Sequence, residues 1–313
     1  MRILTVLTAG TLLLAQDQLP TLKVDVDVVS ILASVRDKKG TLMPNLQKED
    51  FTVLEDGKPQ SIKYFTKESD LPLTIGLLVD VSRSQENLID IERRAADQFF
   101  RQVLRKKDIA FLISFGEESE LLQDYTGSPR LLLDGLNQLR VSGGASSGGG
   151  LHPGPVPTIS QPRGTVLFDA TYLAANDKLK GEVGRKVIVV ITDGVDQGSK
   201  LNRAQAIEAA QKADAVIYSI DYEDPRYHGM FGPSGDADLK KMSDETGGHV
   251  YRVDRKNTLD QVFKELQDEM RSQYLIGYSS TNEAKDGGYR HLDIRTSNKD
   301  LRVQARRGYY AAK

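Results

Sequence analysis

The middle of the chain contains short runs of apolar residues, and a strand formed by such a run has no polar face for contact with water. The clearest are residues 73–79 (LTIGLLV), 109–115 (IAFLISF) and 186–192 (KVIVVIT). A strand with one solvated face alternates apolar and polar residues, whereas a strand covered on both faces reads as a nearly unbroken apolar run. We therefore predict a mainly parallel sheet between two layers of helices, an α/β fold of the Rossmann-like, doubly wound type.

Segments with helical spacing separate these runs, as parallel strands require. Apolar residues recur every three or four positions at Leu88, Ile91, Ala95, Phe99 and Val103, which predicts a helix with this stripe against the sheet. Further helices are predicted over 131–139, 165–179, 204–213, 239–246 and 259–270, and further strands over 120–125, 215–220 and 249–253.

Both ends of the chain follow a different rhythm, with a period of two. Such alternation is typical of half-buried strands, and Asp56-Gly57 is a hairpin signal within the first flank. Neither flank offers enough strands to be stable alone. We predict that the flanks, 21–68 and 273–311, fold together as a small antiparallel β-sandwich-like module. The α/β domain, 71–272, is then an insertion in this module.

The first 15 residues have the three parts of a secretory signal peptide in the expected order. Arg2 gives a positive start, an apolar stretch follows, and the small residue Ala15 precedes a polar segment. The stretch is too short to span a membrane, and a buried helix or strand is the alternative interpretation. We predict a signal peptide at 1–15, no membrane span after its removal, and a secreted or periplasmic protein.

The amino-acid composition excludes several kinds of functional site. The 313 residues include no Cys and four His, which excludes disulfides, thiolate metal sites, iron–sulfur clusters and a cysteine nucleophile. The 42 Lys and Arg against 44 Asp and Glu give a net charge of −2, without the basic excess that favours nucleic acid. Any metal site must therefore use oxygen ligands, which suit hard cations such as magnesium, manganese or calcium.

Oxygen-bearing side chains follow two of the buried runs. Asp80, Ser82 and Ser84 come directly after one run, Asp193 follows another, and Thr165 opens a predicted helix. In open parallel sheets, ligands bind beyond the carboxyl ends of the strands, so we expect these side chains to meet. We predict that they hold a divalent cation, Mg²⁺ first, with Mn²⁺ or Ca²⁺ as alternatives.

The balance of ligands favours binding of a partner over activation of water. Hydroxyls of Ser82, Ser84 and Thr165 would touch the ion without cancelling its charge, and the two Asp can hold these hydroxyls and bound waters from behind. The ion then keeps an open position for an incoming carboxylate. We predict that the protein is not an enzyme but captures an Asp or Glu side chain of a protein partner, whose identity the sequence does not give.

The order Asp-x-Ser-x-Ser, then a distant Thr, then a distant Asp, resembles the metal-ion-dependent adhesion site of von Willebrand factor A (VWFA) domains. The resemblance covers about residues 71–255 and implies a VWFA fold. It also implies that the Ser and Thr give hydroxyls and that the Asp act directly or through water. The flanks resemble a secreted bacterial VWFA-related family in the stretches 35–40, 51–60 and 307–310.

Three features depart from the family pattern. Many members have Gly at the place of Arg83 and an apolar residue at the place of Gln85. We expect Arg83 to face solvent, and steering of an acidic ligand is the alternative. The Gly- and Pro-rich segment 142–164 could displace the hydroxyl of Thr165, which would leave the metal site weak or empty.

Two other functions stay open. A metal-dependent hydrolase could use the same pocket, although no His joins the five residues and both Asp are needed for the ion. A structural VWFA module with a non-functional metal site is the other alternative. Asp221, Glu223 and Asp224 follow a further strand, where we expect a solvated loop, with a rim of the ligand face or a second ion site as the alternatives.

Overall fold

The structure is a computed structural model that describes residues 28–67, 71–142, 164–223 and 235–313. The predicted signal peptide at 1–15, most of the segment 142–164 and Asp224 lie outside the described residues. In the described part of the chain, none of the helices combines the length and the apolar character needed to cross a membrane.

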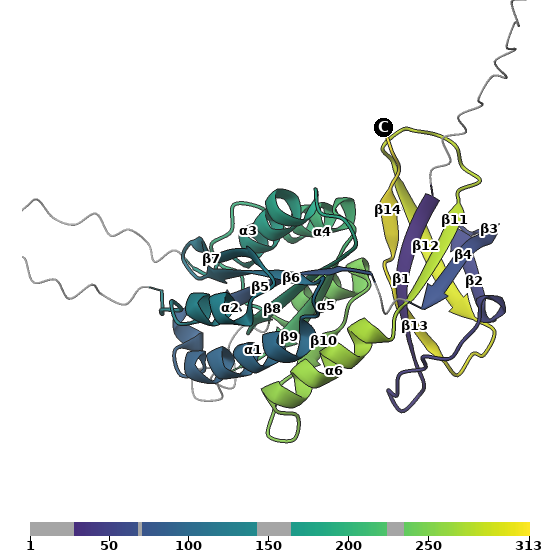
Figure 1. The fold of residues 1–313 in the computed structure, drawn as a ribbon. Coiled ribbons are helices and arrows are strands. Elements are labelled where there is room, and N and C mark those ends of the chain that lie inside the picture. The colour runs from purple at the N-terminus through teal and green to yellow at the C-terminus, as the bar shows by residue number, and fades with distance from the viewer. Residues whose placement is uncertain (1–27, 68–70, 143–163, 224–234) are drawn as a thin grey trace, which may run out of the picture.

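A six-stranded sheet forms the centre of the larger unit (Figure 1). Its strand order is β10-β9-β8-β5-β6-β7, and all neighbours are parallel except β6 and β7. Every residue of β5 and β8 is buried, as their apolar sequences predict. The strands are β5 (Leu73–Asp80), β6 (Ile109–Phe115), β7 (Ser119–Thr126), β8 (Arg185–Thr192), β9 (Ala215–Asp221) and β10 (Val250–Arg252).

Helices cover both faces of this sheet, and a separate apolar core fills the space on each side (Figure 1). One face carries α1 (Ile89–Val103), α2 (Pro129–Leu136) and α6 (Leu259–Arg271). The other face carries α3 (Leu167–Tyr172), its π-helical continuation η3 (Leu173–Leu179), α4 (Arg203–Lys212) and α5 (Asp236–Thr246). The predicted α/β fold with a mainly parallel sheet is confirmed.

The buried face of α1 differs from the predicted stripe at one position. Ile91 is 40% exposed, whereas Glu92 is fully buried. The buried side chains of the helix include those at positions 92, 95, 96, 99, 100 and 103, and a stripe with this spacing passes through Glu92 and not Ile91. The prediction was wrong here because a charged residue occupies a position of the apolar face.

Both flanks contribute to each of two four-stranded antiparallel sheets (Figure 1). One sheet is β13-β1-β11-β4, made of Arg302–Ala305, Val28–Arg36, Tyr274–Ser279 and Ile62–Lys67. The other is β14-β12-β2-β3, made of Gly308–Tyr310, Tyr289–Thr296, Phe51–Glu55 and Lys58–Gln60, with a short 3-10 turn η1 (Lys48–Asp50) before β2. A third core lies within this β module. The predicted insertion of the α/β domain into a β module from both chain ends is confirmed.

The chain leaves and re-enters the β module at neighbouring points. Lys67, the last residue of β4, pairs with Tyr274, the first residue of β11. The α/β domain is therefore connected to the module through two adjacent strands of one sheet.

A buried carboxylate joins the two units. Glu269, near the end of α6, is fully buried and accepts hydrogen bonds from the Ser34 hydroxyl (2.9 Å), the Arg36 guanidinium (2.5 Å) and the Tyr251 hydroxyl (2.7 Å). Ser34 and Arg36 belong to β1 of the module, and Tyr251 belongs to β10 of the domain. These partners offset the cost of burying the carboxylate, and because they come from both units, Glu269 links the module to the domain.

We predict that Glu269→Ala lowers the free energy of unfolding by about 3 kcal/mol, because it leaves Arg36 without its counter-ion and two buried hydroxyls without their acceptor. Urea unfolding followed by circular dichroism measures this. The neighbouring Asp268 is exposed, and Asp268→Ala is the control, expected to change stability by less than about 0.5 kcal/mol. Equal stability of the two variants would contradict the role of Glu269.

Candidate metal centre

The order in which the strands join the sheet reverses at β5. After β5 the chain adds β6 and β7 on one side, and β8, β9 and β10 then extend the sheet on the other side. The carboxyl ends of β5 and β8 therefore flank the switch point, where open α/β sheets bind their ligands. Asp80 is the last residue of β5, and Asp193 directly follows β8. Two of the predicted site residues thus lie at the expected place.

Asp80 organises the turn that follows β5. One of its carboxylate oxygens accepts a hydrogen bond from the Thr192 hydroxyl of β8 (2.5 Å), and the other accepts one from the backbone N–H of Ser82 (2.8 Å). The hydroxyls of Ser82 and Ser84 lie 3.0 Å apart, on either side of the start of a 3-10 turn, η2 (Arg83–Gln85). The oxygens of Asp80, Ser82 and Ser84 therefore share one small region.

Asp193 is held in its own turn beside Asp80. Its carboxylate accepts a hydrogen bond from the N–H of Val195 (3.2 Å), and Gly194 between them has a φ of 79°, which a residue with a side chain would adopt only under strain. Asp193 is 2% exposed, and its charge contributes to the raised pKa of Asp80. The structure therefore brings Asp193 to the same end of the sheet as Asp80.

Thr165 is placed through its backbone. Its carbonyl accepts hydrogen bonds from the N–H groups of Gln197 (3.1 Å) and Gly198 (3.0 Å), in the loop that follows Asp193. The N–H of the next residue, Val166, donates to the carbonyl of Gly116, directly after β6. The N–H of Val81, directly after Asp80, donates to the carbonyl of Phe115, the last residue of β6. Thr165 is thus tied to both segments that carry the other site residues.

The five predicted residues divide by exposure. Asp80 and Asp193 are buried, whereas Ser82, Ser84 and Thr165 are half-buried. The two carboxylates are therefore shielded from solvent, whereas the three residues with hydroxyls are partly accessible. A cation held by all five would have its negative ligands among the buried residues and its neutral ligands among the accessible ones.

Glu92 of α1 adds a third buried carboxylate that we did not predict. It is fully buried, and neither of its oxygens has a hydrogen-bond partner among the described residues. The other buried glutamates are treated differently: Glu55 accepts hydrogen bonds from the hydroxyls of Tyr278, Ser280 and Tyr309, and Glu269 is bonded as described above. An unpaired buried carboxylate is costly, so Glu92 marks a place that needs a cation or a proton.

The three carboxylates act on each other. Burial, followed by the charge of Asp193, raises the pKa of Asp80 to about 7. Burial also raises the pKa of Glu92 well above its ordinary value, with further contributions from Asp80 and Asp193. Carboxylate and hydroxyl oxygens are the ligands that hard divalent cations prefer, and such a cation would relieve this repulsion. The residues present therefore fit a divalent metal ion.

Comparison with known proteins agrees with this architecture. Residues 158–265 match the family model of the von Willebrand factor type A domain. The chain contains a von Willebrand factor type A domain. The matched residues include Thr165 and Asp193, whereas Asp80, Ser82 and Ser84 precede them. No curated protein matches the chain.

The solved structures that match the chain share little sequence with it. An aerotolerance-related membrane protein from Bacteroides fragilis is 15% identical to this chain, with a TM-score of 0.46. The match covers 63% of this chain and 98% of that protein's chain. BatB from Bacteroides thetaiotaomicron is 15% identical, with 63% and 97% covered and a TM-score of 0.47. Proximal thread matrix protein 1 of the mussel byssus, solved with a zinc-occupied MIDAS motif, is 12% identical, with 68% and 48% covered and a TM-score of 0.47. At these scores, none of them lends its binding properties to this chain.

Two further residues of the VWFA domain support the site. Thr192 ends the apolar run of β8, and its hydroxyl ties β8 to Asp80. Gln85 is fully buried and donates a hydrogen bond to the carbonyl of Tyr222 (3.1 Å), which anchors the turn after β5 to the chain that leaves β9. The departure from the family pattern at Gln85 thus has a structural reason, and Arg83 is exposed as expected.

The acidic residues after β9 form a separate cluster. Asp221, Glu223 and Asp236 each place one carboxylate oxygen within 4.8 Å of the others. Arg252 pairs with Asp221 (2.8 Å) and with Asp236 (2.6 Å), so a guanidinium already supplies the positive charge. Asp221 is 1% exposed, which makes the predicted solvated loop wrong for this residue.

The raised pKa of Asp80 predicts the pH dependence of stability in the metal-free protein. Below about pH 4, Asp80 is protonated in both states; between pH 4 and 7 only the unfolded chain releases the proton. Stability in EDTA therefore falls as pH rises through this window, by up to about 4 kcal/mol from Asp80 alone. Glu92 acts in the same direction. Urea unfolding between pH 5 and 8 tests this, and stability that is constant or rises with pH would contradict it.

Proposed function

We propose that the VWFA domain of this protein binds a divalent cation at Asp80, Ser82, Ser84, Thr165 and Asp193 and uses it to capture a carboxylate of a protein partner. Mg²⁺ is the proposed ion, with Mn²⁺ and Ca²⁺ as alternatives. We also propose that the protein is exported to the periplasm or the cell exterior, on the basis of the signal-peptide pattern in residues 1–15.

The collection of carboxylates at the switch point carries the proposal. Asp80, Asp193 and Glu92 are all buried there, and no donor from the described part of the chain bonds to Glu92. A divalent cation offsets most of this negative charge, whereas protonation would be needed without it. Oxygen ligands of this kind are those that magnesium and calcium select.

The arrangement of charge favours an acidic partner. The half-buried residues that border the solvent side contribute neutral hydroxyls, from Ser82, Ser84 and Thr165. A cation held from below by carboxylates keeps its attraction for an anion that approaches from solvent. A side-chain carboxylate of another protein supplies that anion and a further oxygen ligand.

Binding is proposed in preference to catalysis. A metal-dependent hydrolase needs a general base within hydrogen-bond reach of water or substrate. Both oxygens of Asp80 are already bonded, to Ser82 and Thr192, and Glu92 is fully buried on the sheet side of α1. Neither carboxylate is placed to take a proton from a substrate that approaches from solvent.

Metal binding is tested by calorimetric titration with MgCl₂. We expect Ser84→Ala to weaken Mg²⁺ binding by about tenfold or more, because it removes a hydroxyl ligand and the contact to Ser82. Ser297 is exposed and lies in the β module, and Ser297→Ala is the matched control, expected to bind as the parent does. Equal affinity of the two variants, or no binding by the parent protein, would refute the proposed site.

Capture of a carboxylate is tested with acetate as the probe. In the Mn²⁺-loaded protein, acetate should replace a water on the ion and lower the water-proton relaxation enhancement, whereas the neutral isostere acetamide should not. Relaxation that does not respond to acetate while Mn²⁺ is bound would refute carboxylate capture and leave metal binding intact.

The variant Glu92→Gln tests whether this buried carboxylate contributes to metal binding. We expect the variant to be more stable than the parent in EDTA at pH 8, because an unpaired buried charge is removed, and to bind Mg²⁺ about tenfold more weakly. Glu86 is exposed and six residues earlier, so Glu86→Gln is the control. A Glu92→Gln variant with unchanged Mg²⁺ affinity would show that this carboxylate does not serve the ion.

A further inference from the structure

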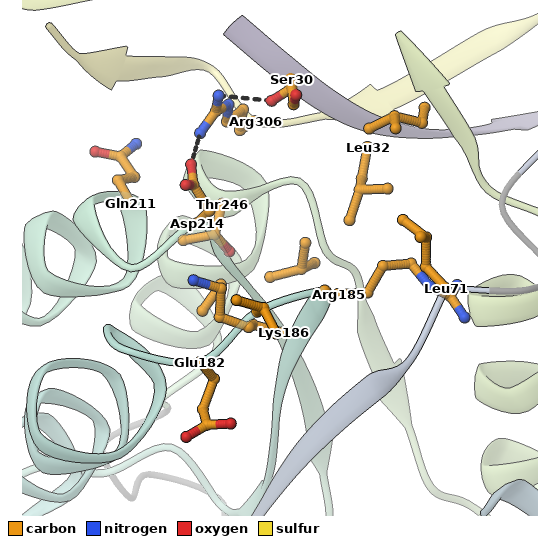
Figure 2. A pocket seen from close by; sticks show the side chains of 15 residues that line it. Ser30, Leu32, Leu71, Glu182, Arg185, Lys186, Gln211, Asp214, Thr246 and Arg306 are labelled. Atoms are coloured by element: carbon orange, nitrogen blue, oxygen red, sulfur yellow. Dashed lines mark hydrogen bonds and ion pairs between the residues drawn. The ribbon is translucent and has the colours of Figure 1, made fainter. Parts of the chain in front are cut away.

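A cavity of about 420 Å³ lies at the end of the sheet opposite the candidate metal centre, where the VWFA domain meets the β module. Figure 2 shows that its walls come from both units: Leu32 and Arg306 belong to the module, and Lys186 belongs to the amino-terminal end of β8. Its volume falls in the range of about 300–1,000 Å³ that is typical of small-molecule sites.

The wall of the cavity is largely apolar. Leu32 and Leu275 line it from the module, and Leu71, Val183 and Val216 line it from the domain. Leu71 is 41% exposed and Val183 is 81% exposed, which places both among the most exposed large apolar residues of the described chain. Two neighbouring apolar side chains left in water beside a cavity favour a ligand with an apolar body that covers them.

One charge in the cavity lacks a counter-ion. Lys186 is 8% exposed, and among the described residues its ammonium has neither a hydrogen bond nor an ion pair. On the opposite side of the cavity, the two terminal nitrogens of Arg306 are engaged: one pairs with Asp214 (2.5 Å) and the other donates to the carbonyl of Ser30 (2.7 Å) (Figure 2). The side chain of Lys186 is largely buried while its ammonium still reaches the cavity, so an anion that enters the cavity can form a charge-assisted hydrogen bond with it.

The environment of Lys186 sets the charge of that anion. Burial lowers the pKa of the Lys186 ammonium, and the charges of Asp214 and Glu182 oppose this effect. Together with Arg185 and Arg306, the cavity has three basic and two acidic side chains, an excess of one positive charge. A ligand with a single negative charge matches this balance, whereas a phosphate dianion would be repelled by the two acids.

We propose that this cavity is a binding site for a small apolar monocarboxylate, with the carboxylate on the Lys186 ammonium and the apolar body against Leu71, Val183 and Leu275. Because the ligand contacts both units, it would stabilise their junction. The site is independent of the proposed metal centre, since β5 separates the two ends of the sheet by about 23 Å.

Octanoate is the probe, used below its micellar concentration in calorimetry and thermal unfolding of the full chain. We expect octanoate to bind and to raise the unfolding temperature, and octan-1-ol to bind about tenfold more weakly because it lacks the charge. Lys186→Met keeps an unbranched side chain that is one atom shorter and uncharged, and it should weaken octanoate binding by about tenfold or more. Lys180→Met is the matched control at an exposed lysine outside the cavity, and it should bind as the parent does.

Val183→Asp provides a second test that does not alter a buried position, since Val183 is 81% exposed. The added negative charge at the rim should also weaken octanoate binding. The proposal is overturned if octanoate does not bind the parent protein, or if it binds Lys186→Met and Val183→Asp with the parent's affinity.

Discussion

The parallel pairing of β5 with β8 determines where the other parts of this protein lie. The two strands stay in register from Leu73 opposite Arg185 to Val79 opposite Ile191, and every residue of both is buried. Because the strands run in the same direction, their carboxyl ends meet and bring Asp80 to the Thr192 hydroxyl. Their amino ends also meet, and there the sheet borders the β module and the cavity. One pairing thus creates two ends with opposite chemistry.

Buried charge distinguishes these two ends from the rest of the interior. The other two buried glutamates of the described residues accept several hydrogen bonds, Glu55 from three hydroxyls and Glu269 from Ser34, Arg36 and Tyr251. At the carboxyl ends Glu92 has no donor, and at the amino ends Lys186 has no acceptor among the described residues. Since a folded protein rarely leaves such groups uncompensated, both ends are suited to ligands, of opposite sign.

Much of this arrangement could be predicted from the sequence, because its cause is local. Unbroken apolar runs predict strands covered on both faces, and the ends of parallel strands converge, which brings Asp80 and Asp193 together. Glu92 was missed because apolar periodicity ignores a charged residue, even one at the right helical phase. The cavity could not be foreseen, since it depends on how two units pack, through contacts such as Arg306 with Asp214, 92 residues away in the chain.

The pairing of Lys67 with Tyr274 has a consequence for how such a protein can be built. Since these residues are cross-strand neighbours, their Cα atoms lie about 5 Å apart, a gap that a two-residue turn can bridge. Excision of the whole α/β domain would then leave an ordinary hairpin between β4 and β11, and the two sheets of the module would keep all their strands. The module can thus accept, between β4 and β11, other inserted domains whose termini lie close together.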